Sequence, residues 1–308
     1  MSLQKTLHYL TYLAVRIFIC VVQAVRIETC ERLADILATL ATDVIPLRRK
    51  LIDENLQHAF PGLDQRRRRR LAKRMWKHLF LLVAEVAHAP RKIHETNWRK
   101  FVQLKDPDLL VRVLLEERPV ILVSGHFGNF ELSGFMLGVL GFPTYTVARP
   151  LDNPYLHDFV GRFRGATGQH IIPTKGGYDQ ILAVLRGGGA MAFLADQYAG
   201  TKGCWVEFFG RPASAHKAIG LLALHNDAPM AVGYAMRVGK PLQYELRICD
   251  VADPRNHEDR SVTGVRPLTQ WYSRTIENIV RLAPDQYWWL HDRWKDRRKP
   301  KQKSRQAA

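Results

Sequence analysis

Cysteine is scarce in this sequence, and its placement argues against two classes of protein. Cys20, Cys30, Cys204 and Cys249 are scattered along 308 residues, with no Cys-x-x-Cys pair and no spacing typical of a metal site. A disulfide-stabilised secreted domain normally carries a dense, even-numbered set of cysteines. The pattern therefore indicates a reduced catalytic region that faces the cytosol.

Acidic residues are also few, with 29 Asp and Glu against 46 Lys and Arg, so the formal net charge is +17. Such an excess points to an anionic partner: nucleic acid, an anionic membrane surface or a phosphorylated lipid. The sequence lacks a zinc finger, an RRM signature and a helix-turn-helix, and a hydrophobic N-terminus has no purpose in a nucleic-acid-binding protein. We therefore expect no nucleic-acid partner. Nucleic-acid binding is kept only as a remote alternative to an enzymatic function.

Several motifs of cofactor and nucleophile chemistry are missing. There is no G-x-S-x-G elbow of an α/β hydrolase, and glycines 187–189 precede a strand without the G-x-G-x-x-G spacing of a dinucleotide site. The histidines at 170, 216, 225 and 257 form no cluster of the kind that binds a metal. We expect a reaction that needs no metal and no cofactor.

A long hydrophobic run occurs at the N-terminus. Residues 7–25 include 15 apolar residues out of 19, which is enough to cross a bilayer. Arg16, near the middle, costs about 2.5–3.5 kcal/mol on an insertion scale and makes a span marginal. We expect residues 1–27 to form a membrane-anchoring helix that either spans the bilayer or lies on it; the alternative is a core helix of a soluble protein.

Basic residues follow this segment, among them Arg26, Arg32, Arg48–Lys50 and Arg66–Arg70. Beside a spanning helix they would keep the rest of the chain in the cytosol. Beside a helix that lies on the membrane they would attract an anionic leaflet, at about 1 kcal/mol per basic residue. We expect residues 28–118 to be a helical, basic, membrane-associated region, although Arg66–Arg70 could equally be a solvated helix start.

From residue 119 the pattern changes to short apolar runs, at 120–124, 144–148, 170–172, 191–195, 229–238 and 244–249. Segments with helical character lie between several of them, at 129–140, 153–166, 177–187 and 214–225, and a last helix is expected at roughly 266–283. Strands that alternate with helices predict an α/β domain with a mixed, largely parallel sheet flanked by helices. We assign this domain to residues 119–298 and a basic, disordered tail to residues 299–308.

The stretch ILVSGHFGNFELS at 121–133 places His126 where an apolar strand ends. In an α/β sheet, ligands bind beyond the carboxyl ends of the strands. Glu131 lies five residues later, in the first turn of the next helix, where a bend could bring it beside His126. It could then accept the Nδ1 proton and leave Nε2 as a general base. A structural histidine beside a glutamate favoured by the helix dipole is the alternative.

The surrounding residues strengthen the first interpretation. SGHFGNFE resembles the H-x4-D/E motif of the late acyltransferases of lipid A biosynthesis. Three further blocks are similar to those of the family and occur in its order: ARPLDNPYLHDFVGRFRGATG, then LADQYAG with VEFFGRPAS, and APDQYWWLHDRWK near the C-terminus. The resemblance covers roughly residues 119–298, and the N-terminal helix occupies the place of the family's membrane anchor.

This resemblance implies a fold similar to that of glycerolipid acyltransferases and an O-acyltransferase activity. A fatty acyl chain would pass from acyl carrier protein, or from acyl-CoA, to a hydroxyl of a glycolipid, with a lipid A precursor as the expected acceptor. A phosphatidylinositol mannoside is the alternative acceptor. The expected location is the bacterial inner membrane, with the catalytic domain on the cytoplasmic side.

Carried over by position, the resemblance makes His126 the general base and Glu131 the residue that orients it. Arg149, Arg164 and Asp196 match further positions on which the family depends, and we assign them to substrate binding. Arginines there could clamp a phosphate or carboxylate, or be surface charges, and Asp196 could simply cap a loop. Backbone N–H groups near Gly128 and Asn129 are the expected oxyanion donors.

The aromatic residues of these blocks allow two interpretations. Phe208 and Phe209 could contact the acyl chain or belong to the core. Those near the C-terminus could form a belt at the membrane interface or pack inside the protein; they are Tyr287, Trp288, Trp289 and Trp294.

Overall fold

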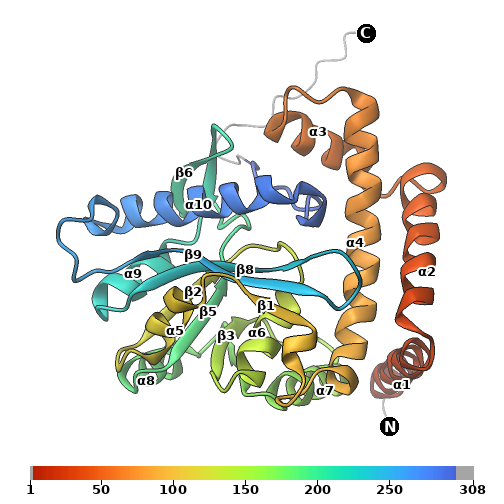
Figure 1. The fold of residues 1–308 in the computed structure, drawn as a ribbon, viewed down its shortest axis with the longest axis horizontal. Coiled ribbons are helices and arrows are strands. Elements are labelled where there is room, and N and C mark those ends of the chain that lie inside the picture. The colour runs from red at the N-terminus through yellow and green to blue at the C-terminus, as the bar shows by residue number, and fades with distance from the viewer. Residues whose placement is uncertain (1–2, 296–308) are drawn as a thin grey trace.

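A seven-stranded sheet forms the centre of the computed structural model, which describes residues 3–295 (Figure 1). The strand order is β1-β9-β8-β2-β5-β3-β4. The strands are β1 (Val102–Leu104), β2 (Val120–Ser124), β3 (Thr144–Ala148), β4 (Gln169–Pro173), β5 (Ala190–Leu194), β8 (Met230–Arg237) and β9 (Tyr244–Ala252). All neighbouring pairs are parallel except β8 with β9. The predicted α/β class with a mixed, largely parallel sheet is confirmed.

Both faces of the sheet are covered, which explains why its strands read as continuous apolar runs. Ile121 and Val123 of β2 face one core cluster, while Val120 and Leu122 face the other. The helices of the α/β part are α5 (Pro107–Leu115), α6 (Phe130–Val139), α7 (Pro154–Gly165), α8 (Tyr178–Arg186), α9 (Lys217–His225) and α10 (Val265–Leu282). The helices expected near 129–140, 153–166, 177–187 and 266–283 are all present; the one expected at 214–225 begins later, at Lys217.

Two parts of this architecture were not predicted from the sequence. Strands β6 (Cys204–Phe208) and β7 (Arg211–Ala215) form a separate antiparallel hairpin against α10. Strand β1 joins the main sheet and α5 packs against β9, so the α/β architecture begins before residue 119. Short 3-10 helices lie at Trp98–Lys100, Arg260–Val262 and Pro284–Gln286. The expected tail at 299–308 lies outside the described residues.

The N-terminal region consists of helices α1 (Leu3–Ala24), α2 (Ile27–Thr39), α3 (Arg49–Ala59) and α4 (Gln65–Lys92), with a π-helical turn at Leu40–Val44 after α2. Helix α4 has 28 residues and is therefore about 42 Å long. Its N-cap is Asp64, whose side chain accepts a hydrogen bond from the Arg67 backbone amide. Figure 1 shows α4 beside both α2 and the edge of the α/β part. This helix joins the two regions.

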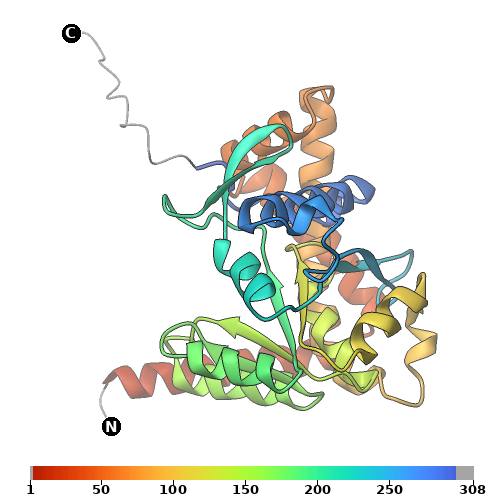
Figure 2. The same cartoon turned by 90° about the vertical axis from the view of Figure 1, so that its left-hand side faces the viewer.

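Helix α1 is long and apolar enough to cross a membrane, with a mean hydropathy of 1.5 and none of its 18-residue apolar window buried. Along one side it contacts α7, where the Asn153 side chain donates to the His8 carbonyl oxygen. The Arg16 guanidinium lies 5.1 Å from the centre of the Phe159 ring and donates to the Tyr12 hydroxyl at 3.0 Å. Figure 2 shows α1 lengthwise along the lower edge of the molecule. Arg16 therefore has partners within the protein.

Candidate active site at the end of strand β2

The loop between β2 and α6, residues 125–129, carries His126. A side chain at Gly125 would meet the Asp196 carboxylate, because its Cβ would lie 3.1 Å from Oδ2. Gly128 has a φ of +58°, and a Cβ there would lie 2.1 Å from the Ala235 carbonyl oxygen. Glycine is therefore needed at 128, whereas at 125 a larger residue would press on Asp196 and Ile276. The Asn129 side chain then caps α6 by accepting from the Leu132 amide at 3.1 Å.

The partner of His126 is Asp196. Ser124 and Leu194, the last residues of β2 and β5, are paired in the parallel ladder, so the residues that follow them leave the sheet side by side. His126 Nδ1 lies 2.7 Å from Asp196 Oδ1, and the His126 backbone N–H donates to Oδ2 at 2.8 Å. Asp196 is only 4% exposed. The carboxylate thus holds both the backbone and the ring of His126.

This geometry determines which ring nitrogen can act on a substrate. Because Nδ1 faces a carboxylate, it is the nitrogen that carries the proton, and Nε2 carries the lone pair. The Gln197 amide nitrogen lies 3.2 Å from Nε2, in donating position. The rings of Phe130 and Trp288 pack against the imidazole, with centroids at 5.0 and 5.6 Å. The ring is fixed, with Nε2 available as a base.

Burial and charge shift the pKa values of this pair in opposite senses. Burial lowers the pKa of His126, but the charge and hydrogen bond of Asp196, with the charge of Glu131, outweigh it, and the net shift is upward. Burial raises the pKa of Asp196, but His126 and Arg293 more than offset it and bring the pKa to about 2. Asp196 is therefore ionised at neutral pH and favours a protonated imidazole.

The prediction that Glu131 accepts the His126 Nδ1 proton is wrong. Its two carboxylate oxygens each accept from Nη2 of Arg164 at 2.8 Å, and Asp196 occupies the position beside Nδ1. The reason is that β5 is the neighbour of β2, which brings Asp196 to the imidazole from another strand. Glu131 still contributes a charge that raises the pKa of His126.

The three residues assigned to substrate binding lie in different surroundings. Asp196 is buried against the imidazole, and Arg164 pairs with Glu131 and has a buried Nε without a partner among the described residues. Arg149 is exposed and forms an ion pair with Asp152 at 3.1 Å. Among the five predicted site residues, the structure brings together His126 with Asp196 and Glu131 with Arg164.

The expected oxyanion donors are already engaged. The Gly128 amide donates to the Gln286 carbonyl oxygen at 2.9 Å, and the Asn129 amide donates to that of Ala235 at 2.8 Å. These bonds follow from the tight approach of the loop to β8 and to the 3-10 helix Pro284–Gln286, which a single sequence does not reveal. The prediction for Gly128 and Asn129 is therefore wrong, and Gln197 is the side chain with an N–H at Nε2.

An apolar cavity of about 110 Å³ lies beside this site, and Glu131 and Arg164 line it. Its apolar lining comes mainly from β2, β5, α6 and β8, and includes Leu122, Phe130, Leu137, Phe193, Leu194 and Ala231. The aromatic residues that could have contacted the acyl chain or the membrane interface belong to the core instead: Phe208, Phe209, Tyr287, Trp289 and Trp294 are all buried there. Trp288 packs on His126 instead.

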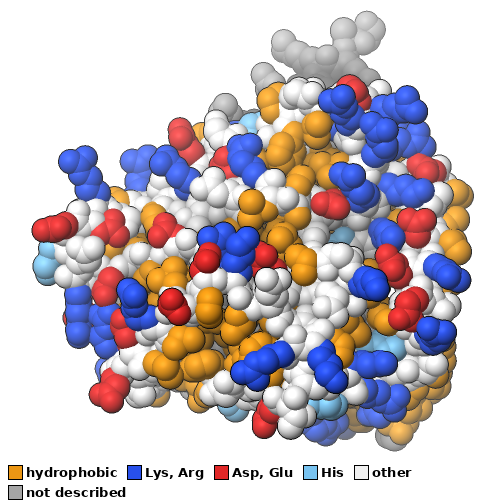
Figure 3. Space-filling model, in the orientation of Figure 1, with side chains coloured by type: hydrophobic (Ala, Val, Ile, Leu, Met, Phe, Trp, Pro, Cys, Tyr) orange, Lys and Arg blue, Asp and Glu red, His pale blue; other side chains and the backbone are white. Residues whose placement is uncertain are grey.

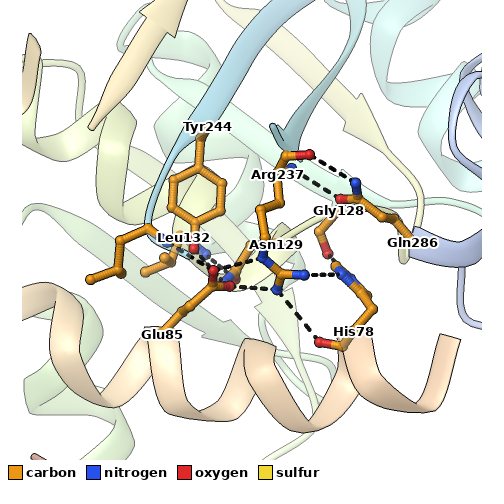
Figure 4. A network of polar contacts seen from close by, with 9 residues as sticks. His78, Glu85, Gly128, Asn129, Leu132, Arg237, Tyr244 and Gln286 are labelled. Atoms are coloured by element: carbon orange, nitrogen blue, oxygen red, sulfur yellow. Dashed lines mark hydrogen bonds and ion pairs between the residues drawn. The ribbon is translucent and has the colours of Figure 1, made fainter. Parts of the chain in front are cut away.

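A buried polar network supports the loop that carries His126 from below (Figure 4). Glu85 of α4 and Arg237 of β8 form two hydrogen bonds of 2.6 Å, and neither side chain is more than 10% exposed. The side-chain amide of Asn129 donates to Glu85 at 3.2 Å and to the Tyr244 hydroxyl at 3.3 Å. Residue by residue, the network connects α4 and the sheet to the start of α6. No sequence signal links Glu85 to Arg237, which lie 152 positions apart.

His78 forms the second connection between α4 and the loop. Its Nε2 lies 3.0 Å from the Gly128 carbonyl oxygen, and the Arg237 guanidinium donates to its Nδ1 at 2.8 Å. Burial, with the charge of Arg237, lowers the pKa of His78 to about 3, so the ring is neutral at physiological pH. A neutral ring can donate from Nε2 and accept at Nδ1, as both contacts require.

We expect Glu85→Ala to lower the free energy of unfolding by about 3–5 kcal/mol, because it leaves the Arg237 charge buried without its partner. Urea unfolding in detergent, followed by tryptophan fluorescence, measures the change. A second variant, Glu85→Leu with Arg237→Met, removes both charges and should recover a large part of the loss. Asp152→Ala, which breaks an exposed pair, is the control and should change little. Equal stability of Glu85→Ala and the control would contradict this account.

The chain is similar over nearly its whole length to known bacterial proteins. The model of the family described as bacterial lipid A biosynthesis acyltransferase matches residues 1–296. Among curated proteins, the lipid A biosynthesis lauroyltransferase of Escherichia coli (strain K12) is 24% identical over 298 residues, covering 94% of this chain and 92% of that protein. The lipid A biosynthesis palmitoleoyltransferase of the same organism is 23% identical, covering 85% and 83%.

A solved structure is also similar to this chain. The 1-acyl-sn-glycerophosphate acyltransferase of Thermotoga maritima matches with a TM-score of 0.40 and 13% identity, covering 86% of this chain and 100% of that one.

Proposed function

This chain belongs to the bacterial lipid A biosynthesis acyltransferase family and is an acyltransferase, and we propose that it transfers a fatty acyl chain from acyl carrier protein to a hydroxyl of a lipid A precursor. The observation that carries the catalytic part is the 2.7 Å contact of His126 Nδ1 with Asp196, which leaves Nε2 as the basic nitrogen. The arrangement is that of a histidine base oriented by a buried carboxylate, without a protein nucleophile.

In the proposed reaction, the acceptor hydroxyl displaces the Gln197 amide from Nε2 and gives its proton to that nitrogen. The hydroxyl oxygen attacks the thioester carbonyl carbon, a C–O bond forms, and the C–S bond breaks. The proton then passes from Nε2 to the leaving thiolate, so the products are an ester and a free thiol. Asp196 stabilises the imidazolium during the transfer.

We assign the remaining residues by their surroundings. The displaced Gln197 amide stays beside the reacting carbon and can donate to the oxyanion. Glu131 keeps a charge near His126 and holds Arg164, whose guanidinium can bind a phosphate or the donor carbonyl. The apolar cavity beside both residues accepts the start of the acyl chain. Arg149, exposed and paired with the equally exposed Asp152, can contact a phosphate of the glycolipid.

The proposed location is the bacterial inner membrane, with α1 as anchor and the catalytic region on the cytoplasmic side. Helix α1 supports this by its length and its unburied apolar surface. The net charge of +17 suits both an anionic leaflet and an acidic acyl carrier protein, and it makes both associations weaken with added salt.

The proposal is tested with the purified full-length protein in detergent micelles. Acyl carrier protein charged with acyl chains of different lengths is the donor, an under-acylated lipid A precursor is the acceptor, and mass spectrometry detects the product. We expect one acyl group to be added with release of the thiol, and a slower reaction with acyl-CoA. Acylation of a phosphatidylinositol mannoside but not of the lipid A precursor would overturn the proposed acceptor. No transfer to either lipid would overturn the proposed reaction.

A further inference from the structure

Helix α2 and the π-helical turn and loop that follow it, up to residue 47, carry an unusual distribution of side chains. The residues that face α4 are small and buried, among them Ala34, Ala38 and Ala41. From Leu33 onward the large apolar residues point outward, and we call them the α2 stripe: Leu33, Ile36, Leu37, Leu40, Val44, Ile45 and Leu47, each between 42% and 64% exposed. An amphipathic helix of a water-soluble protein places its large apolar residues on the core side. The reversed arrangement in α2 indicates that something apolar covers the outer side.

The stripe continues the exposed apolar surface of α1. Leu7, Leu10, Ile17, Phe18 and Val21 of α1 are each more than half exposed. Figure 1 shows α1 and α2 along the same side of the molecule, and Figure 3 shows hydrophobic side chains along that edge. A joint apolar surface of this extent marks an interaction site.

Basic side chains border the far end of the stripe. Arg48, Arg49 and Lys50 directly follow Leu47 and are exposed, as are Arg66, Arg67, Arg69 and Arg70 at the start of α4. The ion pair of Arg69 with Asp43, at 2.7 Å, holds the start of α4 against the π-helical turn that precedes Arg48–Lys50, and so brings the two basic groups together. A hollow of about 340 Å³ lies between them, lined by Arg49, Lys50 and Arg69 and by Leu47 and Trp76. Figure 3 shows the blue side chains gathered at this corner. Exposed apolar residues next to clustered basic ones are typical of surfaces that bind anionic lipid.

We propose that the α2 stripe is a second membrane-contacting surface, which inserts into the anionic leaflet beside α1 while the basic residues at its end bind lipid headgroups. The inference extends the membrane association in the proposed function. It assigns the contact to a helix whose packing side consists of small residues and whose apolar residues have no cover within the described chain. Helix α1 is then one of two helices that hold the enzyme on the membrane.

The main test uses a depth probe, because it does not depend on how strongly α1 binds. Ile36→Cys in a Cys20→Ser background is labelled with an environment-sensitive fluorophore, and Leu115→Cys, an exposed position on α5, is the matched control. The full-length protein is mixed with vesicles of phosphatidylglycerol. We expect a blue shift and several-fold protection from aqueous iodide at position 36 and neither effect at position 115. Equal iodide access at both positions would overturn the proposal.

A pair of matched variants tests the energetic contribution. Leu33→Ser with Leu40→Ser should weaken binding to phosphatidylglycerol vesicles about tenfold, whereas Leu115→Ser with Leu282→Ser should not. Unchanged vesicle binding by the stripe variant, with a shift from dimer to monomer in detergent, would overturn the proposal and identify an interface between copies. Acyl transfer in micelles should be the same for both variants. A wild-type enzyme inactive in that assay would contradict the proposed reaction, whereas iodide access at position 36 would still decide whether the stripe enters the leaflet.

Discussion

Replacing His126 by alanine is expected to slow acyl transfer by at least ~10²-fold, the scale of general-base catalysis by a positioned side chain. The variant keeps Asp196, Gln197 and the cavity, so substrates should still bind, and the loss should lie mainly in kcat. The measurement is the initial rate of ester formation in micelles, with acyl carrier protein thioester as donor and mass spectrometry as detection.

His257→Ala is the control for this experiment, because His257 is an exposed loop histidine far along the chain from the site. It should transfer acyl groups at the normal rate. Circular dichroism and thermal unfolding of both variants must match the wild-type protein, since a folding defect would also reduce the rate. Wild-type activity in a folded His126→Ala protein would mean that another group deprotonates the acceptor.

The second large effect is expected for Asp196→Asn, with a loss of roughly 10³- to 10⁴-fold by analogy with the orienting carboxylate of a serine-protease triad. Asparagine is nearly the same size as aspartate but has no charge to stabilise the imidazolium. It can also present an N–H to Nδ1, which would favour the wrong tautomer. The comparison variant is Glu131→Gln, which changes the carboxylate at the other predicted position. Because Glu131 bonds Arg164 and not the imidazole, Glu131→Gln should slow acyl transfer less than Asp196→Asn does.

The pH dependence of kcat/KM separates an electrostatic role of Asp196 from a purely structural one. The free base is the active form of His126, so activity should fall as the pH decreases through its raised pKa. Burial lowers that pKa, and Asp196 is the main influence that raises it. Without the carboxylate, the acidic limb should move to lower pH in Asp196→Asn. Glu131→Gln should move it less, in the same direction. An unmoved limb in Asp196→Asn would contradict the assigned pairing.

The sequence contained enough information for most of the fold. Apolar runs such as 120–124 are buried on both faces of the sheet, so they are visible without knowledge of their neighbours. Strand β1 has only three residues, and β6 and β7 form an outlying hairpin, so neither carries a strong pattern. Such short or outlying strands can be recognised only from the strands with which they pair in the folded protein.

The site was predictable only in part, for a related reason. His126 could be located because Gly125 and Gly128 mark a loop at the end of a strand. Its partner depended on which strand lies next to β2, and that order is a property of the whole sheet. A spacing of five residues made Glu131 the nearest carboxylate along the chain, whereas Asp196, 70 positions away, is the nearest in space.

Helix α4 has a consequence for how a lipid reaches the site. It packs against α2 along one side, and through His78 and Glu85 it bonds the loop that follows His126. If α2 lies in the leaflet, this rigid connection sets the height of the imidazole above the bilayer. An acceptor whose own acyl chains remain in the membrane can raise a hydroxyl only a limited distance. The width of α4, which lies between α2 and this loop, would then select among lipid acceptors by how far each one's hydroxyl stands from the membrane.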